Sequence, residues 1–356
     1  IRYVPKALVR EMEEDDKGYP PELWQKMAEL GWLGLVFPER YCGTGGSFLD
    51  LVVLLEEMGY SLIPGPFLPT VLSGLAISIA GDERQRKQLL PRIASGQTIL
   101  TLALTESSAR YNASSVAVKA AAESEDYIIT GTKLFVADAN VAEYLICIAR
   151  TSEEENMEYG TTMFLVDMTS PGISCTVLKT IAGDKQCKVV FDKVRVPKTN
   201  ILGKVGEGWR CISQVLAKAA VAQSALLIGN AKQALDIAVN YSKERIQFGR
   251  PIGSFQALQH LMAQLATDLE GGRMLTYEAA WKISEGVPYA LEVAMAKAWM
   301  SDLSQRISIE AHNIVGGVSY SLDHDLPLYF RRIKAGEVVF GDGEFHREAV
   351  ARELGM

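Results

Sequence analysis

The sequence predicts an α+β protein with an N-terminal helical domain (residues 1–97), a middle β-barrel or β-sandwich domain (98–200) and a C-terminal four-helix bundle (201–356). Two observations predict this fold class. Apolar residues recur at helical spacing in both end regions. Between them, short β-branched runs broken by Gly, Asp and Asn replace that spacing over about one hundred residues. A chain of 356 residues is long enough for two or three domains with sizeable cores.

The N-terminal region is expected to consist of helices, with a loop at residues 39–47. Pro21 is placed at a helix start, where its missing N–H costs nothing. Residues 48–58 and 65–80 carry apolar faces typical of helices. A charged helix is expected to begin at residues 81–83 and to end within residues 91–96.

The middle region is expected to consist of short strands. β-branched and aromatic residues are concentrated in runs that turn residues separate. The predicted strands are residues 98–105, 126–137, 143–150, 161–168, 173–180 and 188–197. After Pro197 the helical spacing returns, and it predicts helices at about 210–240, 257–284, 287–315 and 325–352.

Composition excludes several classes of function. A hydrophobic content of 48% and a charged content of 22% are ordinary for a soluble protein. The net charge of −7 argues against nucleic acid as a partner. We expect no membrane partner, because no apolar run approaches spanning length and no signal peptide is recognisable. The chain begins at Ile1, so we expect that an N-terminal piece is missing.

Cysteine usage indicates a reducing compartment. Five scattered cysteines without metal-ligand spacing suit reduced thiols in the cytoplasm. The four histidines also make no metal-binding pattern, so no metal site is expected.

The segment 241–256, YSKERIQFGRPIGSFQ, connects two of the predicted long helices. Within it Arg245, Phe248 and Gln256 supply a guanidinium group, an aromatic ring and an amide. These groups are suited to holding a phosphate and a flat ring. The alternative is an ordinary solvated corner between helices.

This segment resembles the R-x-x-F-G-[RK]-x-[IL]-x-x-x-Q motif of the acyl-CoA dehydrogenase family, FAD enzymes that desaturate acyl-CoA thioesters. The resemblance covers nearly the whole chain. Further matching segments, in the family's order, are Gly81–Arg86, Leu104–Glu106, Asp126–Lys133, Phe191–Pro197, Gly316–Gly317 with Tyr320, and Val350–Glu353. The sequences of residues 324–332 and 340–347 resemble those of a bacterial branch of the family in which two different subunits form α2β2 tetramers.

The resemblance implies a specific chemistry. A carboxylate removes the α-proton of an acyl-CoA thioester, and FAD accepts the β-hydrogen as hydride. FAD lies across a subunit interface, so a same-family subunit is the implied partner, in a homo- or hetero-tetramer. An electron-transfer flavoprotein is the implied electron acceptor. The neighbouring subunit holds the adenosine diphosphate part of FAD with residues that correspond here to Arg245, Phe248, Gln256, Gly316 and Gly317.

The resemblance also identifies candidates for the flavin-facing half, where this chain departs from the family. Leu104 and Thr105 match the family's loop, but its Gly-Ser pair is replaced by Arg110 and Tyr111. The family's W-x-[TS] strand is represented by residues 135–137. Phe135 supplies a ring for stacking, whereas Ala137 has no hydroxyl group. Asp342 and Glu344 are the remaining candidate cofactor contacts in the closing segment.

Neither family position for the catalytic base carries an acid here. Aligned without a gap, these positions fall on Phe340 and Ala219, with Ala220 following. A general base must be a titratable group in reach of the proton. Asp342 is the best candidate substitute, although a turn-stabilising role in the Phe-Gly-Asp-Gly sequence is the favoured explanation for it. The acids considered after it are Glu337, Glu344 and Asp323.

Three interpretations therefore remain open. The chain is a base-less subunit that completes the FAD site of a different partner. Alternatively, it is a self-sufficient homo-oligomeric dehydrogenase that uses a displaced acid such as Asp342. The third interpretation is a binding or scaffold protein that has lost flavin. Retention of the Arg245, Phe248 and Gln256 set argues against the third.

Overall fold

The computed structural model describes residues 4–356. They form two compact units, which are described separately. One unit contains residues up to 9, 48–63 and 217–356, and it holds the helical bundle. The other contains residues 10–47 and 64–216, and it holds the sheet. The predicted α+β class, with helices at both ends of the chain and strands between them, is confirmed.

Helices α1 (Lys6–Glu14), α2 (Pro21–Glu29), α4 (Phe67–Ala80) and α5 (Glu83–Ala94) precede the strands. Helix α5 begins with a capping box between Asp82 and Gln85. It ends at Ala94, within the predicted stretch 91–96, and Pro91 lies inside its last turn. Burial of Leu90 and Ile93 stabilises the last turn enough to offset the backbone bond that proline removes.

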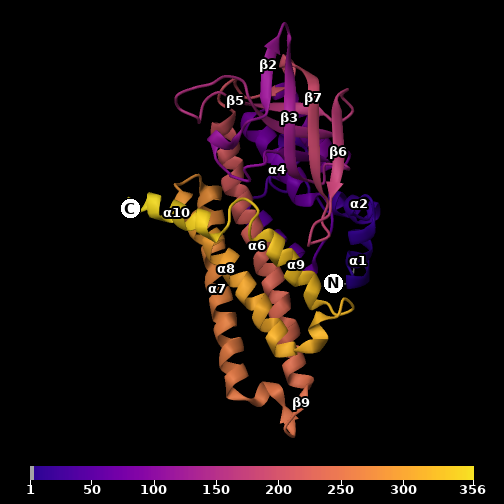
Figure 1. The fold of residues 1–356 in the computed structure, drawn as a ribbon, viewed down its shortest axis with the longest axis vertical. Helices are drawn as coiled ribbons and strands as arrows, with labels where there is room; N and C mark the ends of the chain where they lie inside the picture. Colours follow the sequence, from indigo (N-terminus) through magenta and orange to yellow (C-terminus); the bar gives the residue numbers. More distant parts are fainter. Residues whose placement is uncertain (1–3) are drawn as a thin grey trace. The chain divides into compact units, whose positions relative to one another are not determined.

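One mixed sheet contains all the strands of the middle region (Figure 1). Its members are β1 (Leu100–Ala103), β2 (Lys119–Glu123), β3 (Asp126–Ala137), β4 (Tyr144–Arg150), β5 (Thr161–Asp167), β6 (Ile173–Leu178), β7 (Gln186–Pro197) and β8 (Ile201–Leu202). The strand order is β6-β7-β3-β2-β4-β5-β8, and β1 pairs in parallel with β4. Strand β2 was not predicted, because its KAAAE sequence lacks β-branched residues; antiparallel pairing with β3 orders it.

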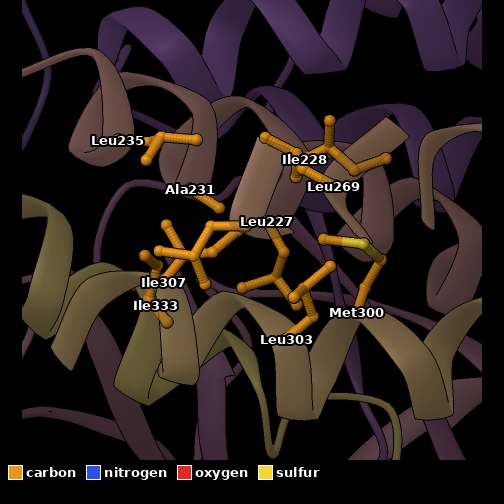
Figure 2. Close-up of a cluster of buried hydrophobic side chains, with 10 residues drawn as sticks. Leu227, Ile228, Ala231, Leu235, Leu269, Met300, Leu303, Ile307 and Ile333 are labelled. Carbon is orange, nitrogen blue, oxygen red and sulfur yellow. The ribbon is translucent and has the colours of Figure 1, made fainter. Parts of the chain in front are cut away.

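The bundle unit is built from α3 (Phe48–Ser61), α6 (Gly208–Glu244), α7 (Gln256–Glu285), α8 (Ala290–Val315), α9 (Leu326–Gly336) and α10 (Gly343–Glu353), although the first residues of α6 belong to the sheet unit. Its core joins side chains from four of these helices, and Figure 2 shows Leu227 of α6 between Met300, Leu303 and Ile333. Helices α3 and α6 approach closely at Gly59, where an added Cβ would lie 2.3 Å from the carbonyl oxygen of Leu226.

The last predicted helix, residues 325–352, is two helices, so that prediction is wrong. Helix α9 ends at Gly336, and α10 starts at Gly343. Between them Phe340 and Gly341 have φ angles of 61° and 97°, which are incompatible with a continuous right-handed helix.

Helix α6 also corrects the expectation that no apolar run approaches spanning length. By length and composition it is able to cross a membrane, and it is the one such helix within residues 4–356. However, 61% of its most apolar stretch is buried inside the protein. That burial is typical of the core helix of a bundle.

Candidate functional site

The segment after α6 forms a small β-hairpin rather than a plain connection. Strands β9 (Ile246–Gln247) and β10 (Arg250–Pro251) pair antiparallel. The two residues between them, Phe248 and Gly249, have φ angles of 54° and 78°, as a tight two-residue hairpin turn requires. The Ile252 N–H closes the hairpin by donating to the Arg245 carbonyl at 2.8 Å.

The candidate cofactor-binding side chains of the hairpin segment are exposed on the surface of the protein. The Phe248 ring is 92% exposed, and Arg245 and Gln256 are also exposed. The Phe248 ring meets Phe255 edge to face at 6.1 Å, and the Arg250 guanidinium stacks on Phe255 at 4.2 Å from its centroid. A large ring left in water and held at positive φ contributes little to the chain's own packing. The hairpin is therefore suited to contacts with another molecule.

Gly316 and Gly317 follow the last residue of α8. Gly316 has φ 76° and ψ −154°, a combination open essentially to glycine alone. A Cβ added at either position would meet no atom within 4 Å. The chain's own packing therefore does not explain why position 317 is glycine. Open space over two glycines allows the backbone to approach an external group closely.

In the sheet unit, a buried ion pair holds the candidate loop against β3. The Lys133 ammonium, which is 0% exposed, lies 2.7 Å from Glu106 and donates to the Leu104 carbonyl at 3.0 Å. The Glu106 carboxylate also accepts the backbone N–H groups of Ala117 and Val118. These bonds satisfy both buried charges, so the loop is fixed by structure rather than left to solvent.

The same loop lies beside the part of β3 that carries Phe135. The Leu134 N–H donates to the Thr105 carbonyl at 2.8 Å, so the structure brings Leu104 and Thr105 next to Phe135. A register shift in the pairing with β7 coincides with Phe135, which has φ 51° and an exposed ring. Ala137 lies two residues further on and supplies no hydrogen-bonding side chain.

The turn between α9 and α10 contains the first candidate base position. Phe340 occupies it, and its carbonyl lies 2.9 Å from Nε2 of His346. Asp342 is the N-cap of α10, and its carboxylate accepts the Phe345 N–H at 2.8 Å. This contact agrees with the turn-stabilising interpretation of Asp342. Glu344 lies exposed in the first turn of α10.

Two further candidate acids flank α9. Glu337 is 6% exposed and pairs with Lys334 at 2.6 Å. Asp323 lies exposed in the segment between α8 and α9. The second candidate base position, Ala219, is fully buried in α6 and is followed by the equally buried Ala220. Neither candidate base position therefore carries a titratable side chain.

Sequence reasoning missed Lys297, which organises the turn at Phe340. Its ammonium is fully buried and donates to the Ser301 hydroxyl, the Glu337 carbonyl and the Gly341 carbonyl, at 2.9, 2.7 and 2.6 Å. Burial lowers the pKa of Lys297 to about 7, against the opposing effect of nearby acids. The available signal was a single lysine inside the apolar run AMAKAWM of α8.

Comparison with known proteins identifies the family. The descriptions of the acyl-CoA dehydrogenase N-terminal, middle and C-terminal domains match residues 2–97, 101–194 and 206–355. The acryloyl-CoA reductase (NADH) of Anaerotignum propionicum is 32% identical over 94% of this chain and 87% of its own length.

Two solved structures have the same architecture. Butyryl-CoA dehydrogenase from Megasphaera elsdenii superimposes with a TM-score of 0.91 at 29% identity, covering 99% of this chain and 94% of its own. A chain of the ChsE4–ChsE5 complex from Mycobacterium tuberculosis gives 0.89 at 26% identity, covering 99% and 93%. The chain therefore belongs to the acyl-CoA dehydrogenase family, FAD-dependent flavoproteins that act on a CH–CH bond.

Proposed function

We propose that this chain is the base-less subunit of a heteromeric acyl-CoA dehydrogenase that desaturates an acyl-CoA thioester at its α,β-bond. One observation carries the proposal: Phe340 and Ala219 occupy the two base positions of the family, whereas the exposed set that serves a neighbour's cofactor is retained. Removal of an α-proton requires a titratable group. In this account the partner subunit supplies that carboxylate.

The exposed residues of the bundle unit fit FAD. The Arg245 guanidinium suits the pyrophosphate, because its planar fork matches phosphate oxygens. Phe248 and Gln256 supply an aromatic face and an amide. The backbone of Gly316 and Gly317 is open to close approach, since no side chain of this protein occupies the space above it. When bound, FAD supplies the hydride-accepting ring system of the reaction.

The flavin-facing half fits less well. The backbone of Thr105 is bonded to Leu134, the residue before Phe135, and the exposed Phe135 ring suits contact with a flat ring. Ala137 offers no donor, and the exposed Arg110 replaces a small residue in the adjoining loop. Retention of one half and alteration of the other is the pattern expected of a subunit that works in a partner's site.

Structural neighbours add support. One of them belongs to a complex described by two different names, ChsE4 and ChsE5. The partner proposed here is accordingly a different subunit of the same family, in a tetramer. Acyl-CoA is the proposed substrate, an electron-transfer flavoprotein the proposed electron acceptor, and the cytoplasm the proposed location.

The two other interpretations have weaker support. A self-sufficient enzyme needs Asp342 as its base, yet that carboxylate already caps α10. A scaffold without flavin does not explain why the Phe248 ring is 92% exposed. Neither interpretation accounts for both halves of the site.

The test uses the chain isolated together with its native partner subunit. Replacing Arg245 by Gln removes the guanidinium while keeping a polar side chain. We expect FAD per complex to fall at least tenfold at limiting FAD, with the partner still bound. The matched control is Arg352→Gln, an exposed arginine in α10 outside the hairpin. Unchanged FAD content in the Arg245 variant would show that Arg245 does not contribute to FAD binding, and would contradict the assignment of the hairpin to the cofactor site.

A further inference from the structure

Two cysteines lie diagonally across neighbouring strands at one edge of the sheet. In the antiparallel pair β6–β7, Cys175 is opposite Val189 and Cys187 is opposite Val177. Residues two apart on a strand share a face, so both thiols project from the same face of the sheet. Diagonal positions of this kind are within side-chain reach of each other.

The two thiols differ in accessibility and in acidity. Cys175 is exposed, whereas Cys187 is fully buried. The neighbouring Cys187 thiol lowers the pKa of Cys175, and the neighbouring Cys175 thiol together with burial raises the pKa of Cys187. The Cys187 thiol also donates weakly to Oδ1 of Asn140, at 3.8 Å. An accessible thiol of lowered pKa beside a second thiol is the arrangement found in reversibly oxidised pairs.

We propose that Cys175 and Cys187 form a reversible dithiol–disulfide site that reacts with low-molecular-weight disulfides. The Cys175 thiolate attacks one sulfur of the small disulfide, forms a mixed disulfide and releases one thiolate. Cys187 then loses its proton and attacks the Cys175 sulfur, which expels the second thiolate. The protein loses two electrons and two protons, and the small disulfide becomes two thiols.

The position of β6 makes closure of this bond feasible. Diagonal neighbours are about 7–8 Å apart, whereas a disulfide prefers about 4.4–6.8 Å between its Cα atoms. Strand β6 ends the sheet order and pairs with β7 alone, so it is able to move toward Cys187. A bond that pulls the backbone is strained, and strained disulfides are reduced more readily. The pair is therefore expected to be reversible rather than a permanent crosslink.

The site adjoins the aromatic segment of β3. Cys187 pairs with Val136, which directly follows Phe135. Movement of β6 and β7 on oxidation therefore acts on the strand that carries the exposed ring.

Trypsin makes the test direct. The folded full-length chain is treated with oxidised glutathione, blocked with an alkylating reagent and digested. Cleavage after Arg150, Lys179, Lys185 and Lys188 places the two cysteines on separate peptides, residues 151–179 and 186–188. We expect these two peptides to be disulfide-linked, with the intact chain lighter by two hydrogens at this pair. Dithiothreitol is expected to restore both thiols.

Single variants identify the order of events. Cys187→Ser is expected to keep one glutathione on Cys175, because no second thiol displaces it. Cys175→Ser is expected to leave Cys187 unmodified, because Cys187 is buried. The exposed Cys42 serves as an internal comparator that accumulates a mixed disulfide.

Two results would overturn the proposal, and the wild-type chain alone is enough to obtain them. One is the absence of the link between peptides 151–179 and 186–188. In that case Cys175 either carries a stable glutathione adduct or stays unmodified while Cys42 is modified. The other is a link that forms only after denaturation.

Discussion

The buried ammonium of Lys297 donates a hydrogen bond to the carbonyl oxygen of Gly341 over 2.6 Å. The bond ties α8 to the turn that separates α9 from α10, and Phe340 lies in that turn. The Glu337 carbonyl accepts a second bond from the same ammonium at 2.7 Å. A single buried cation therefore joins both ends of the segment where the family places its base.

Replacing Lys297 by Met should destabilise the protein at neutral pH by about 2 kcal/mol, because the buried Gly341 carbonyl loses its donor and the Glu337 carbonyl keeps only the Ser301 hydroxyl. Chemical unfolding measures this change. The control is Lys243→Met, an exposed lysine of α6, for which we expect less than about 0.5 kcal/mol. Equal stability of the two variants would show that the Lys297 bonds contribute nothing.

The contribution of Lys297 should also depend on pH. Burial lowers its pKa from the ordinary 10.5 to about 7 in the folded state. Between these values the unfolded chain binds more protons, so stability rises with pH, by at most about 1.4 kcal/mol per pH unit. The wild-type free energy of unfolding minus that of Lys297→Met should therefore increase from about pH 7 to pH 10. A flat difference over this range would contradict the assignment.

The buried pair between Glu106 and Lys133 should be far more important than a surface pair. Glu106→Gln leaves an uncompensated buried ammonium, so we expect a loss of about 3–5 kcal/mol in unfolding free energy. The matched control is Glu123→Gln, which removes an exposed partner of Arg195 and should cost less than about 1 kcal/mol. A cost at Glu106 as small as that at Glu123 would mean that water reaches the pair.

Asp342 should behave as a helix cap and not as a base. Asn is an equally good cap, so Asp342→Asn should keep both stability and the dehydrogenation rate of the native complex. Asp342→Ala should lose about 1 kcal/mol of stability, as loss of a cap does. A dehydrogenation rate that collapses in the stable Asn variant would instead support a catalytic carboxylate at this position.

Periodicity was sufficient to predict the order of helices and strands, because burial of one face determines both patterns. It failed where tertiary contacts decide. Strand pairing orders the alanine-rich β2, which has no β-branched residue. The turn at Phe340 depends on Lys297, which is more than forty residues earlier in the chain. Side-chain spacing within one segment does not encode such a contact.

The candidate site was predictable only in part. The Arg245, Phe248 and Gln256 set was recognisable as a motif, but its β-hairpin was not, because Phe is rarely held at positive φ. The bond from the Phe345 N–H to the Asp342 carboxylate depends on the fold of the turn, which residue spacing does not encode. The Leu104–Glu106 segment is held in place by Lys133, which lies on a different strand and donates to the Leu104 carbonyl and the Glu106 carboxylate.

The most direct measurement is the absorbance spectrum of this chain purified alone, with FAD quantified per chain and compared with the chain isolated with its native partner. The account predicts a lone chain with little or no FAD and a complex that contains it, because the base-less chain completes a site in another subunit. A yellow lone chain with one FAD per chain that dehydrogenates an acyl-CoA would contradict it.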